Sequence, residues 1–333
     1  MFDKTNSIRI ILLEEKMSII RNPNLYHGKN KKDNFFEGWY YKLVTKDRKY
    51  TLAIIPGISL SSDSHSFIQV LRGEDVLYDY FRFYKNDFFS SNSYLKINIS
   101  NNSFSLDGIF LDLYNSKLKI KGSLLFSNLV KWSDSIINPG SMGFYNYLKF
   151  MECYSQVCAL DGDIKGTLSI NDNIIDFNDG KVYIEKNWGR SFPVEWLWIQ
   201  SNTFKDSRAT ITCSLGEIPF PLKNFRGFLI GVTVDNMFFP FTTMNRSKLD
   251  LKVESDDILL TVIHKNLRLS LKTITDTNSF ILCYGPKNGQ MVPFVKETLT
   301  AKVQMELVDT KNNTLIYSGE GSNTGIEFGG NLM

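Results

Sequence analysis

Glu185 and Lys186 are adjacent charged residues in a stretch rich in aromatic side chains. If they lie on a strand, they point to opposite faces, so only one of them faces any cavity. Glu185 is then a candidate proton donor. Lys186, which shares a face with Trp188, is a candidate contact for a phenolate or quinol oxygen. The alternative is a surface salt bridge beside a turn, worth about 0–1 kcal/mol.

The residues that follow alternate in a way that favours a ligand cavity. Two indoles and two neutral amides occupy every second position: Trp196, Trp198, Gln200 and Asn202. Strand geometry puts them on one face. Such a face suits a large, flat, mostly apolar ligand better than a plain apolar core, because buried amides need partners. Alternatively, the two amides satisfy a strand edge.

Glu37 is the first candidate for an acid catalyst. On a strand it shares a face with Trp39 and Tyr41. If that face lines an apolar cavity, loss of solvent raises the pKa of the carboxyl group and keeps it protonated near neutral pH. The alternative is a structural glutamate that pairs with Lys42, Lys186 or a backbone amide.

Aromatic side chains near these charged residues suit the wall of a cavity in which a cation develops. The candidates are Trp39, Tyr41, Trp188, Trp196 and Trp198. A tryptophan face attracts a cation by about 0.5–2 kcal/mol, and by more in a dry site. Taken singly, each tryptophan is better explained by core packing.

The elements that must position these residues are predicted to be strands. After residue 35 apolar and polar residues alternate repeatedly, most clearly from residue 298 to residue 307, which is typical of antiparallel strands with one wet face. Turn signals separate these runs about every ten residues, the spacing of a sandwich or a barrel.

We therefore predict an all-β protein built from two antiparallel barrel or sandwich units with few short helices. Residues 1–22 are predicted to form an extension that is helical in part, over residues 7–20. Residues 23–190 are assigned to the first unit and residues 191–333 to the second. Residues 139–151 fill a long gap between strand runs, so they are predicted to be a loop or short helix that caps a barrel mouth.

Composition excludes several classes of function. The chain has 333 residues and a net charge of +3, which is too small to indicate nucleic-acid binding. Four cysteines without a CxxC pair and three histidines predict neither a disulfide framework nor a metal site, and reduced thiols in the cytoplasm are expected. No run of about 20 apolar residues predicts a membrane span. Met17 is an alternative start to Met1.

Nucleotide-binding and hydrolase signatures are missing from the sequence: there is no GxGxxG before a helix, no P-loop and no GxSxG. We therefore expect no cofactor. The sequence does not indicate the oligomeric state.

Five segments resemble the tocopherol cyclase family: residues 35–42, 185–189, 196–202, 292–298 and 327–330. They occur in the family's order over nearly the whole chain. The family in turn resembles the carotenoid hydratases and lipocalin-like Diels–Alderases. The resemblance implies two consecutive lipocalin-like β units. Related hydratases carry an acidic residue and a histidine at the positions of Glu185 and Lys186, which implies a chemical role there.

The resemblance also implies a reaction. In this family an alkene in a prenyl tail is protonated and a phenol oxygen attacks the resulting tertiary cation. The sequence is rich in Lys, Asn and Ile, as in AT-rich bacterial genomes. Many such bacteria make no tocopherol, so the resemblance does not extend to tocopherol as the substrate. We expect a lipophilic prenylated or polyene ligand and an acid-catalysed cyclase or isomerase. The alternatives are a non-catalytic lipid-binding protein and a hydratase that adds water to an isoprenoid alkene.

Overall fold

The computed structural model describes residues 19–148, 151–205, 209–218, 224–254 and 257–330. Within these residues the secondary structure is almost entirely antiparallel β-sheet, so the prediction of an all-β protein is confirmed. The described helical segments are residues 19–21 and three short 3₁₀-helices: η1 (Lys85–Asp87), η2 (Gly143–Tyr147) and η3 (Thr277–Ser279). The helix predicted over residues 7–20 falls mostly outside the described residues, as does Met17.

The first sheet is formed by the strands of the first half of the chain. Its described strands are β1 (Phe35–Val44), β2 (Thr51–Leu60), β3 (His65–Arg72), β4 (Leu77–Tyr84), β5 (Phe88–Ser90), β6 (Lys96–Ile99), β7 (Asn102–Ser105), β8 (Gly108–Tyr114), β9 (Lys119–Val130), β10 (Cys153–Ala159), β11 (Asp161–Ile170), β12 (Asn173–Asp176) and β13 (Gly180–Gly189). Their order is β4-β3-β2-β1-β13-β11-β9-β8-β7-β6-β5, with β10 on β13 and β12 on β11. The sheet curls so far that β3 contacts β6.

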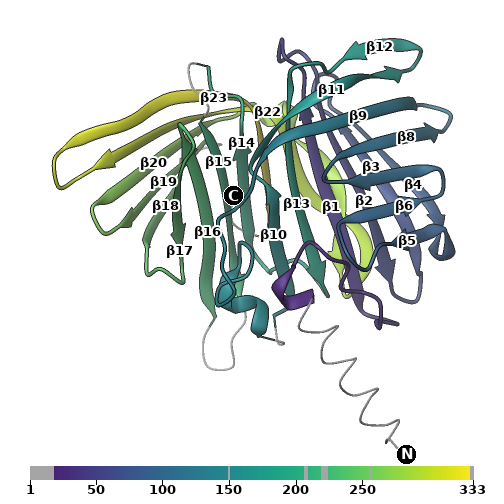
Figure 1. Ribbon diagram of the computed structural model, residues 1–333, viewed down its shortest axis with the longest axis horizontal. Helices are drawn as coiled ribbons and strands as arrows, with labels where there is room; N and C mark the ends of the chain where they lie inside the picture. The colour runs from purple at the N-terminus through teal and green to yellow at the C-terminus, as the bar shows by residue number, and fades with distance from the viewer. Residues whose placement is uncertain (1–18, 149–150, 206–208, 219–223, 255–256, 331–333) are drawn as a thin grey trace, which may run out of the picture.

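The second sheet is formed by the strands that follow. Its described strands are β14 (Trp196–Ser201), β15 (Thr210–Ile218), β16 (Phe225–Val234), β17 (Met237–Thr242), β18 (Lys248–Glu254), β19 (Asp257–His264), β20 (Leu267–Ile274), β21 (Ile281–Lys287), β22 (Gln290–Asp309) and β23 (Thr314–Gly329). Their order is β17-β16-β15-β14-β23-β22-β20-β19-β18, with β21 on β22. Figure 1 shows the two curled sheets side by side, with β13 and β14 near the middle.

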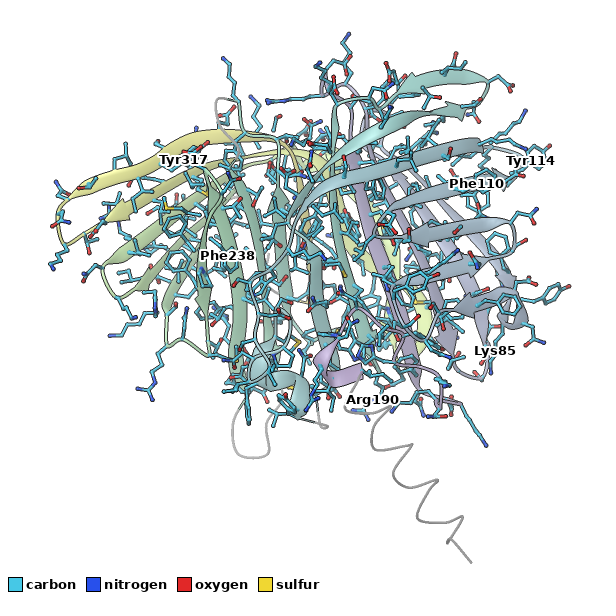
Figure 2. All side chains as sticks on the ribbon, in the orientation of Figure 1. Lys85, Phe110, Tyr114, Arg190, Phe238 and Tyr317 are labelled. Carbon is cyan, nitrogen blue, oxygen red and sulfur yellow. The ribbon has the colours of Figure 1, made fainter. Side chains whose placement is uncertain are left out.

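The three largest apolar clusters of the described residues follow from the alternation of side chains along these strands. Each sheet encloses a core of its own, which contains Tyr41 and Leu43 in the first sheet and Leu197 and Ile199 in the second. A third cluster, with Tyr40 among its members, lies between the sheets. Because successive strand residues point to opposite faces, a strand such as β1 contributes to its own core and to the space between the sheets. Figure 2 shows the periphery by contrast, with Tyr114 projecting outward at the end of β8.

The β21–β22 hairpin reaches from the second sheet to the first. Its turn is Asn288-Gly289, with φ angles of 52° and 77°, as a tight two-residue hairpin requires. The Gly289 amide donates to the Arg190 carbonyl at 2.6 Å, and its carbonyl accepts from the Ser59 hydroxyl at 2.7 Å. A Cβ atom at Gly289 would lie 2.5 Å from the amide nitrogen of Phe35, so only glycine allows this close approach.

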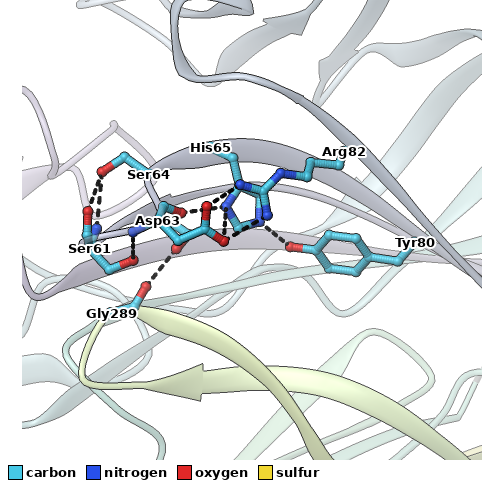
Figure 3. A network of polar contacts seen from close by, with 8 residues as sticks. Ser61, Asp63, Ser64, His65, Tyr80, Arg82 and Gly289 are labelled. Atoms are coloured by element: carbon cyan, nitrogen blue, oxygen red, sulfur yellow. Dashed lines mark hydrogen bonds and ion pairs between the residues drawn. The ribbon is translucent and has the colours of Figure 1, made fainter.

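A polar network fixes the neighbouring β3–β4 hairpin. Figure 3 shows Asp63 and Arg82 in a two-pronged ion pair and His65 between Asp63 and Tyr80. The His65 Nδ1 atom lies 2.7 Å from the Asp63 carbonyl, and Nε2 lies 2.7 Å from the Tyr80 hydroxyl. Gly289 approaches this corner in the same view. The network therefore holds the hairpin where the second sheet docks on the first.

No helix in the described part of the chain has the length and apolar character needed to cross a bilayer.

Candidate functional site

A cavity of about 200 Å³ lies between the two sheets, and its lining is mainly apolar. Strands β1, β2, β3, β10 and β13 line it from the first sheet, and strands β14–β17 and β21–β23 line it from the second. Residues 139–151, predicted to be a loop or short helix, contain η2, and Met142, Tyr145 and Met151 line the cavity.

Strand alternation decides which candidate residues reach this cavity. On β1 the even-numbered Phe36, Gly38 and Tyr40 line it, whereas Glu37 does not. On β13 the odd-numbered Glu185 lines it. Paired residues of neighbouring strands share a face, and Tyr40 pairs with Glu185. Glu185 is therefore the inward acid of the Glu185–Lys186 pair.

Glu185 is buried beneath the second sheet. Its carboxylate accepts hydrogen bonds from the Tyr183 hydroxyl, from Trp198 Nε1 at 2.9 Å and from Asn187 Nδ2 at 3.1 Å. Burial raises the pKa of Glu185, and the three donors offset only part of that rise. The donors hold the carboxyl group in one orientation at the wall of the cavity.

Glu297 and Glu327 form the acidic pair of the opposite wall. They are direct partners across β22 and β23, and both line the cavity. Glu297 accepts from the Tyr40 hydroxyl at 2.5 Å, and Glu327 accepts from Trp196 Nε1 at 2.6 Å. Directly opposed strand residues have Cβ atoms about 4.5–5.5 Å apart, so two negative charges here repel strongly.

Burial and mutual repulsion keep this pair protonated at higher pH than ordinary carboxyl groups. Burial raises the pKa of Glu297 well above its ordinary value, and the charge on Glu327 adds to the rise. Burial raises the pKa of Glu327 to about 7. The hydrogen bond from Trp196 opposes this rise, and the charge on Glu185 adds to it. At neutral pH the pair therefore holds at least one proton in a mostly apolar space.

The indole of Trp196 should report the ionisation of Glu327, because the two are hydrogen bonded. We expect a change in tryptophan fluorescence with a midpoint near pH 7 that is lost in the Glu327→Gln variant. Because the pKa of Glu327 is raised in the folded state, its contribution to stability is complete below about pH 4.5 and is lost as the pH rises through about 7. A midpoint near 4.5 would contradict the burial argument.

Trp196 and Trp198 line the cavity, and each rests on a glycine of β23. A Cβ atom on Gly329 would lie 1.9 Å from Trp196 Cη2, and one on Gly325 would lie 2.5 Å from Trp198 Cζ3. The two glycines therefore make room for the indoles that hold Glu327 and Glu185.

The Gly329→Ala variant should displace the Trp196 indole and break its hydrogen bond to Glu327. We expect the fluorescence change near pH 7 to disappear while the chain stays folded. Gly319→Ala is the control, because a Cβ there meets only the ring end of Tyr317. An unchanged pH titration in Gly329→Ala would show that the indole does not need this space.

Gln200 and Asn202 share the face of the indoles but lie beyond the cavity lining. The Lys42 ammonium group donates to Gln200 Oε1 at 2.6 Å, and Asn202 Nδ2 donates to Asp161 Oδ1 at 3.0 Å. Burial lowers the pKa of Lys42 to about 7, although the nearby charge of Glu297 opposes this change. The two amides therefore join the sheets, and the role expected of them in ligand binding stays a prediction.

Glu37 and Lys186 form a buried ion pair inside the first sheet, with both side chains 0% exposed. Their Oε1 and Nζ atoms are 2.5 Å apart, and the His27 amide donates to Glu37 Oε2 at 2.8 Å. Burial would raise the pKa of Glu37, but Lys186 and His27 outweigh it and hold that pKa below its ordinary value. This placement matches the alternative of a structural glutamate that pairs with Lys186. Neither residue lines the cavity, and the catalytic roles expected of them stay predictions.

The other aromatic candidates of this face belong to the same interior. The Lys186 ammonium group lies 5.0 Å from the ring centre of Trp39 and 4.8 Å from that of Trp188. Tyr41 is fully buried in the core of the first sheet. These three aromatic residues do not line the cavity, because their side chains point into the interior that the curled first sheet encloses: Trp39, Tyr41 and Trp188.

The family model described as tocopherol cyclase-like matches residues 115–330. The chain belongs to the tocopherol cyclase-like family. It is 22% identical over 214 residues to the probable chloroplastic tocopherol cyclase of Oryza sativa subsp. japonica, covering 60% of this chain and 44% of that protein. It is 29% identical over 103 residues to the chloroplastic tocopherol cyclase of Zea mays, covering 30% and 22%. The chain thus spans less than half the length of these family members.

Solved structures show the same fold at low identity. CghA in complex with Sch210972 superposes with a TM-score of 0.58 and 9% identity, covering 88% of this chain and 87% of that chain. Kievitone hydratase from Nectria haematococca superposes with a TM-score of 0.50 and 9% identity, covering 92% and 93%. These likenesses confirm the predicted fold class, an all-β protein with two lipocalin-like units.

Glu297 and Glu327 were not predicted as functional residues, although both lie in segments that carry the family resemblance. A signal for Glu297 was present, because the apolar series of β22 at odd-numbered positions, continued backward from Leu299, reaches this glutamate. An acid in the buried register of a strand marks a candidate site. Glu327 gave a weaker signal, since its neighbours in the same register are Gly325 and Gly329.

Among the described residues no group of three His, Cys, Asp or Glu side chains is placed to hold a metal ion.

Proposed function

We propose that this protein is an acid-catalysed cyclase or isomerase that acts on a lipophilic prenylated or polyene molecule in the cavity between the sheets. The observation that carries the proposal is the pair Glu297 and Glu327, two adjacent carboxyl groups with raised pKa values in a mainly apolar cavity. Membership of the tocopherol cyclase-like family supports the same class of chemistry.

The proposed reaction needs only proton transfer and bond formation within one ligand. A protonated glutamate of the pair gives its proton to one carbon of an alkene, and the π electrons form the new C–H bond. The other carbon becomes a tertiary cation. A phenol oxygen of the same molecule donates a lone pair to that carbon, and its proton passes to the carboxylate. The acid is regenerated and the mass of the ligand is conserved.

The remaining wall residues suit the charge that develops. Trp196 and Trp198 offer electron-rich rings that attract a cation without reacting with it. Glu185 receives three hydrogen bonds, so it is the member of the acidic set best able to carry negative charge near the cation. Tyr40 holds Glu297 in place from the opposite sheet. Both sheets therefore contribute to one reactive centre.

The test is incubation of the purified protein with a geranylated hydroquinone, followed by mass analysis of the products. We expect a chromanol of unchanged mass. A product heavier by one water would assign the protein to alkene hydration, with water in place of the phenol oxygen. Stoichiometric binding without conversion would assign it to lipid binding and would overturn the catalytic proposal.

A further inference from the structure

Gln69 is a polar residue of the cavity wall that the proposed reaction does not use. It lies on β3, its side chain is 3% exposed, and it lines the cavity on the side formed by β21. Its Oε1 atom accepts a hydrogen bond from the Tyr78 hydroxyl at 2.5 Å. No described residue accepts a hydrogen bond from its Nε2 group. A buried amide with unused donors indicates a partner that is not part of the chain.

Neighbouring bonds fix the orientation of this amide. The backbone N–H of Tyr284, which can only donate, points to the Tyr78 hydroxyl oxygen at 3.2 Å. The Tyr78 proton is therefore directed to another acceptor, and Gln69 supplies one through Oε1. If the amide were flipped, Tyr78 would receive two donors and its own proton would have no acceptor. The Nε2 group must then be the end of the amide that is left for the cavity.

The surroundings of Tyr78 and Gln69 are rigid. Tyr78 and Tyr284 stack with ring centres 6.3 Å apart, and Tyr80, the partner of Gln69 across β3 and β4, is hydrogen bonded to His65. Rings from both sheets thus meet at this corner of the cavity, because Tyr284 of β21 packs against Tyr78 and Tyr80 of β4. A rigid donor in a buried wall discriminates between ligands more sharply than a mobile one.

The position of Gln69 sets a distance from the acidic pair. Tyr40, which holds Glu297, lies on β1, and Gln69 lies two strands away on β3. Neighbouring strands are about 4.8 Å apart, so the backbones of β1 and β3 lie about 10 Å apart along this wall. A ligand that reaches both ends can therefore present an alkene to the acids and a second group to Gln69.

We propose that Gln69 is a specificity-determining residue that donates a hydrogen bond from Nε2 to an acceptor oxygen of the ligand, remote from the alkene that is protonated. The inference rests on the proposed function, because it names the ligand class of the same cavity. The ligand is then an isoprenoid that carries at least one carbonyl, ether or hydroxyl oxygen beyond the reacting one. A pure polyene hydrocarbon leaves the amide unpaired, which costs affinity.

The test compares two probes that cannot cyclise, 2-geranyl-1,4-dimethoxybenzene and geranylbenzene. The first has two acceptor oxygens and no donor, and the second has neither. Titration calorimetry gives the ratio of their dissociation constants for the wild-type protein and for Gln69→Leu. We expect the preference for the dimethoxy probe to fall about two- to tenfold in the variant, the value of one neutral hydrogen bond. Affinity for geranylbenzene should not fall.

Two further variants make the outcome decisive. Gln304→Leu, at an exposed position of β22, should leave the ratio unchanged. Tyr78→Phe keeps Gln69 but removes the hydrogen bond that orients its amide. It should therefore lower the preference for the dimethoxy probe, and it serves as the test if Gln69→Leu fails to fold. An equal ratio in wild type, Gln69→Leu and Tyr78→Phe, with both probes bound, would overturn the role of Gln69 alone. A wild-type protein that binds neither probe would overturn the proposed function as well.

Discussion

Replacing Glu297 with Gln should reduce turnover of a geranylated hydroquinone by about 10²- to 10⁴-fold, the usual contribution of a positioned general acid. The amide keeps the size of the side chain and can still bond to Tyr40, but it has no proton to give to an alkene. Glu327→Gln should reduce turnover as well. The two carboxyl groups are neighbours, and the charge on Glu327 helps to keep Glu297 protonated. Product formation measured by chromatography checks both variants.

A control on the same strand separates chemistry from folding. Glu306 is half-exposed and pairs with Arg268, so Glu306→Gln should leave turnover unchanged. Calorimetry with 2-geranyl-1,4-dimethoxybenzene should show that Glu297→Gln still binds a ligand of this size. If Glu297→Gln and Glu327→Gln both kept full turnover, neither carboxyl group would be the acid, and Glu185 would be the remaining candidate at the cavity wall.

Replacing Lys186 with Met should destabilise the protein by about 3–5 kcal/mol, because it leaves the buried Glu37 carboxylate without its partner. The double variant Glu37→Gln/Lys186→Met should lose less, since no uncompensated charge is left inside the first sheet. Urea unfolding measures the three proteins. Lys302→Met is the matched control, because the Lys302–Glu320 pair is about half exposed and worth at most about 1 kcal/mol.

The same pair predicts how stability depends on pH. The folded-state pKa of Glu37 is held below its ordinary value of 4.5, so its contribution to stability is present above pH 4.5 and is lost as the pH falls through the lowered value. The wild-type protein should therefore lose stability in acid more steeply than Glu37→Gln. Parallel acid titrations of the two proteins would contradict a charged Glu37.

The sequence was sufficient to predict the strands and the relations within each strand. Alternation correctly placed Trp196 and Trp198 on one face and separated Glu185 from Lys186. It does not say which face of a strand is turned toward the neighbouring sheet, because both faces of a curled central strand are buried. That is why Glu37 could not be distinguished from Glu185 as the inward acid.

The second part of the site depends on contacts between distant segments. Glu297 and Glu327 become neighbours only through the register of β22 and β23, and Tyr40 meets Glu297 only when the sheets pack together. Local patterns carry no information about such pairings. Gln69 shows the same limit, since its orientation depends on Tyr284 from the other sheet. The segments that resemble the family contain Glu185, Glu297 and Glu327, but a match of a segment assigns no role to a single side chain.

The position of β23 in the second sheet bears on how activity arises during folding. This strand (Thr314–Gly329) lies between β14 (Trp196–Ser201) and β22. One edge of β14 therefore pairs with a strand that follows more than 100 residues later in the chain. Pairings between such distant segments form slowly. The same strand carries Glu327 and the two glycines, Gly325 and Gly329, against which Trp198 and Trp196 pack. On the proposed mechanism, an intermediate without β23 lacks Glu327 and is inactive, so the recovery of cyclase activity on refolding would follow the pairing of β23 with β14 and β22.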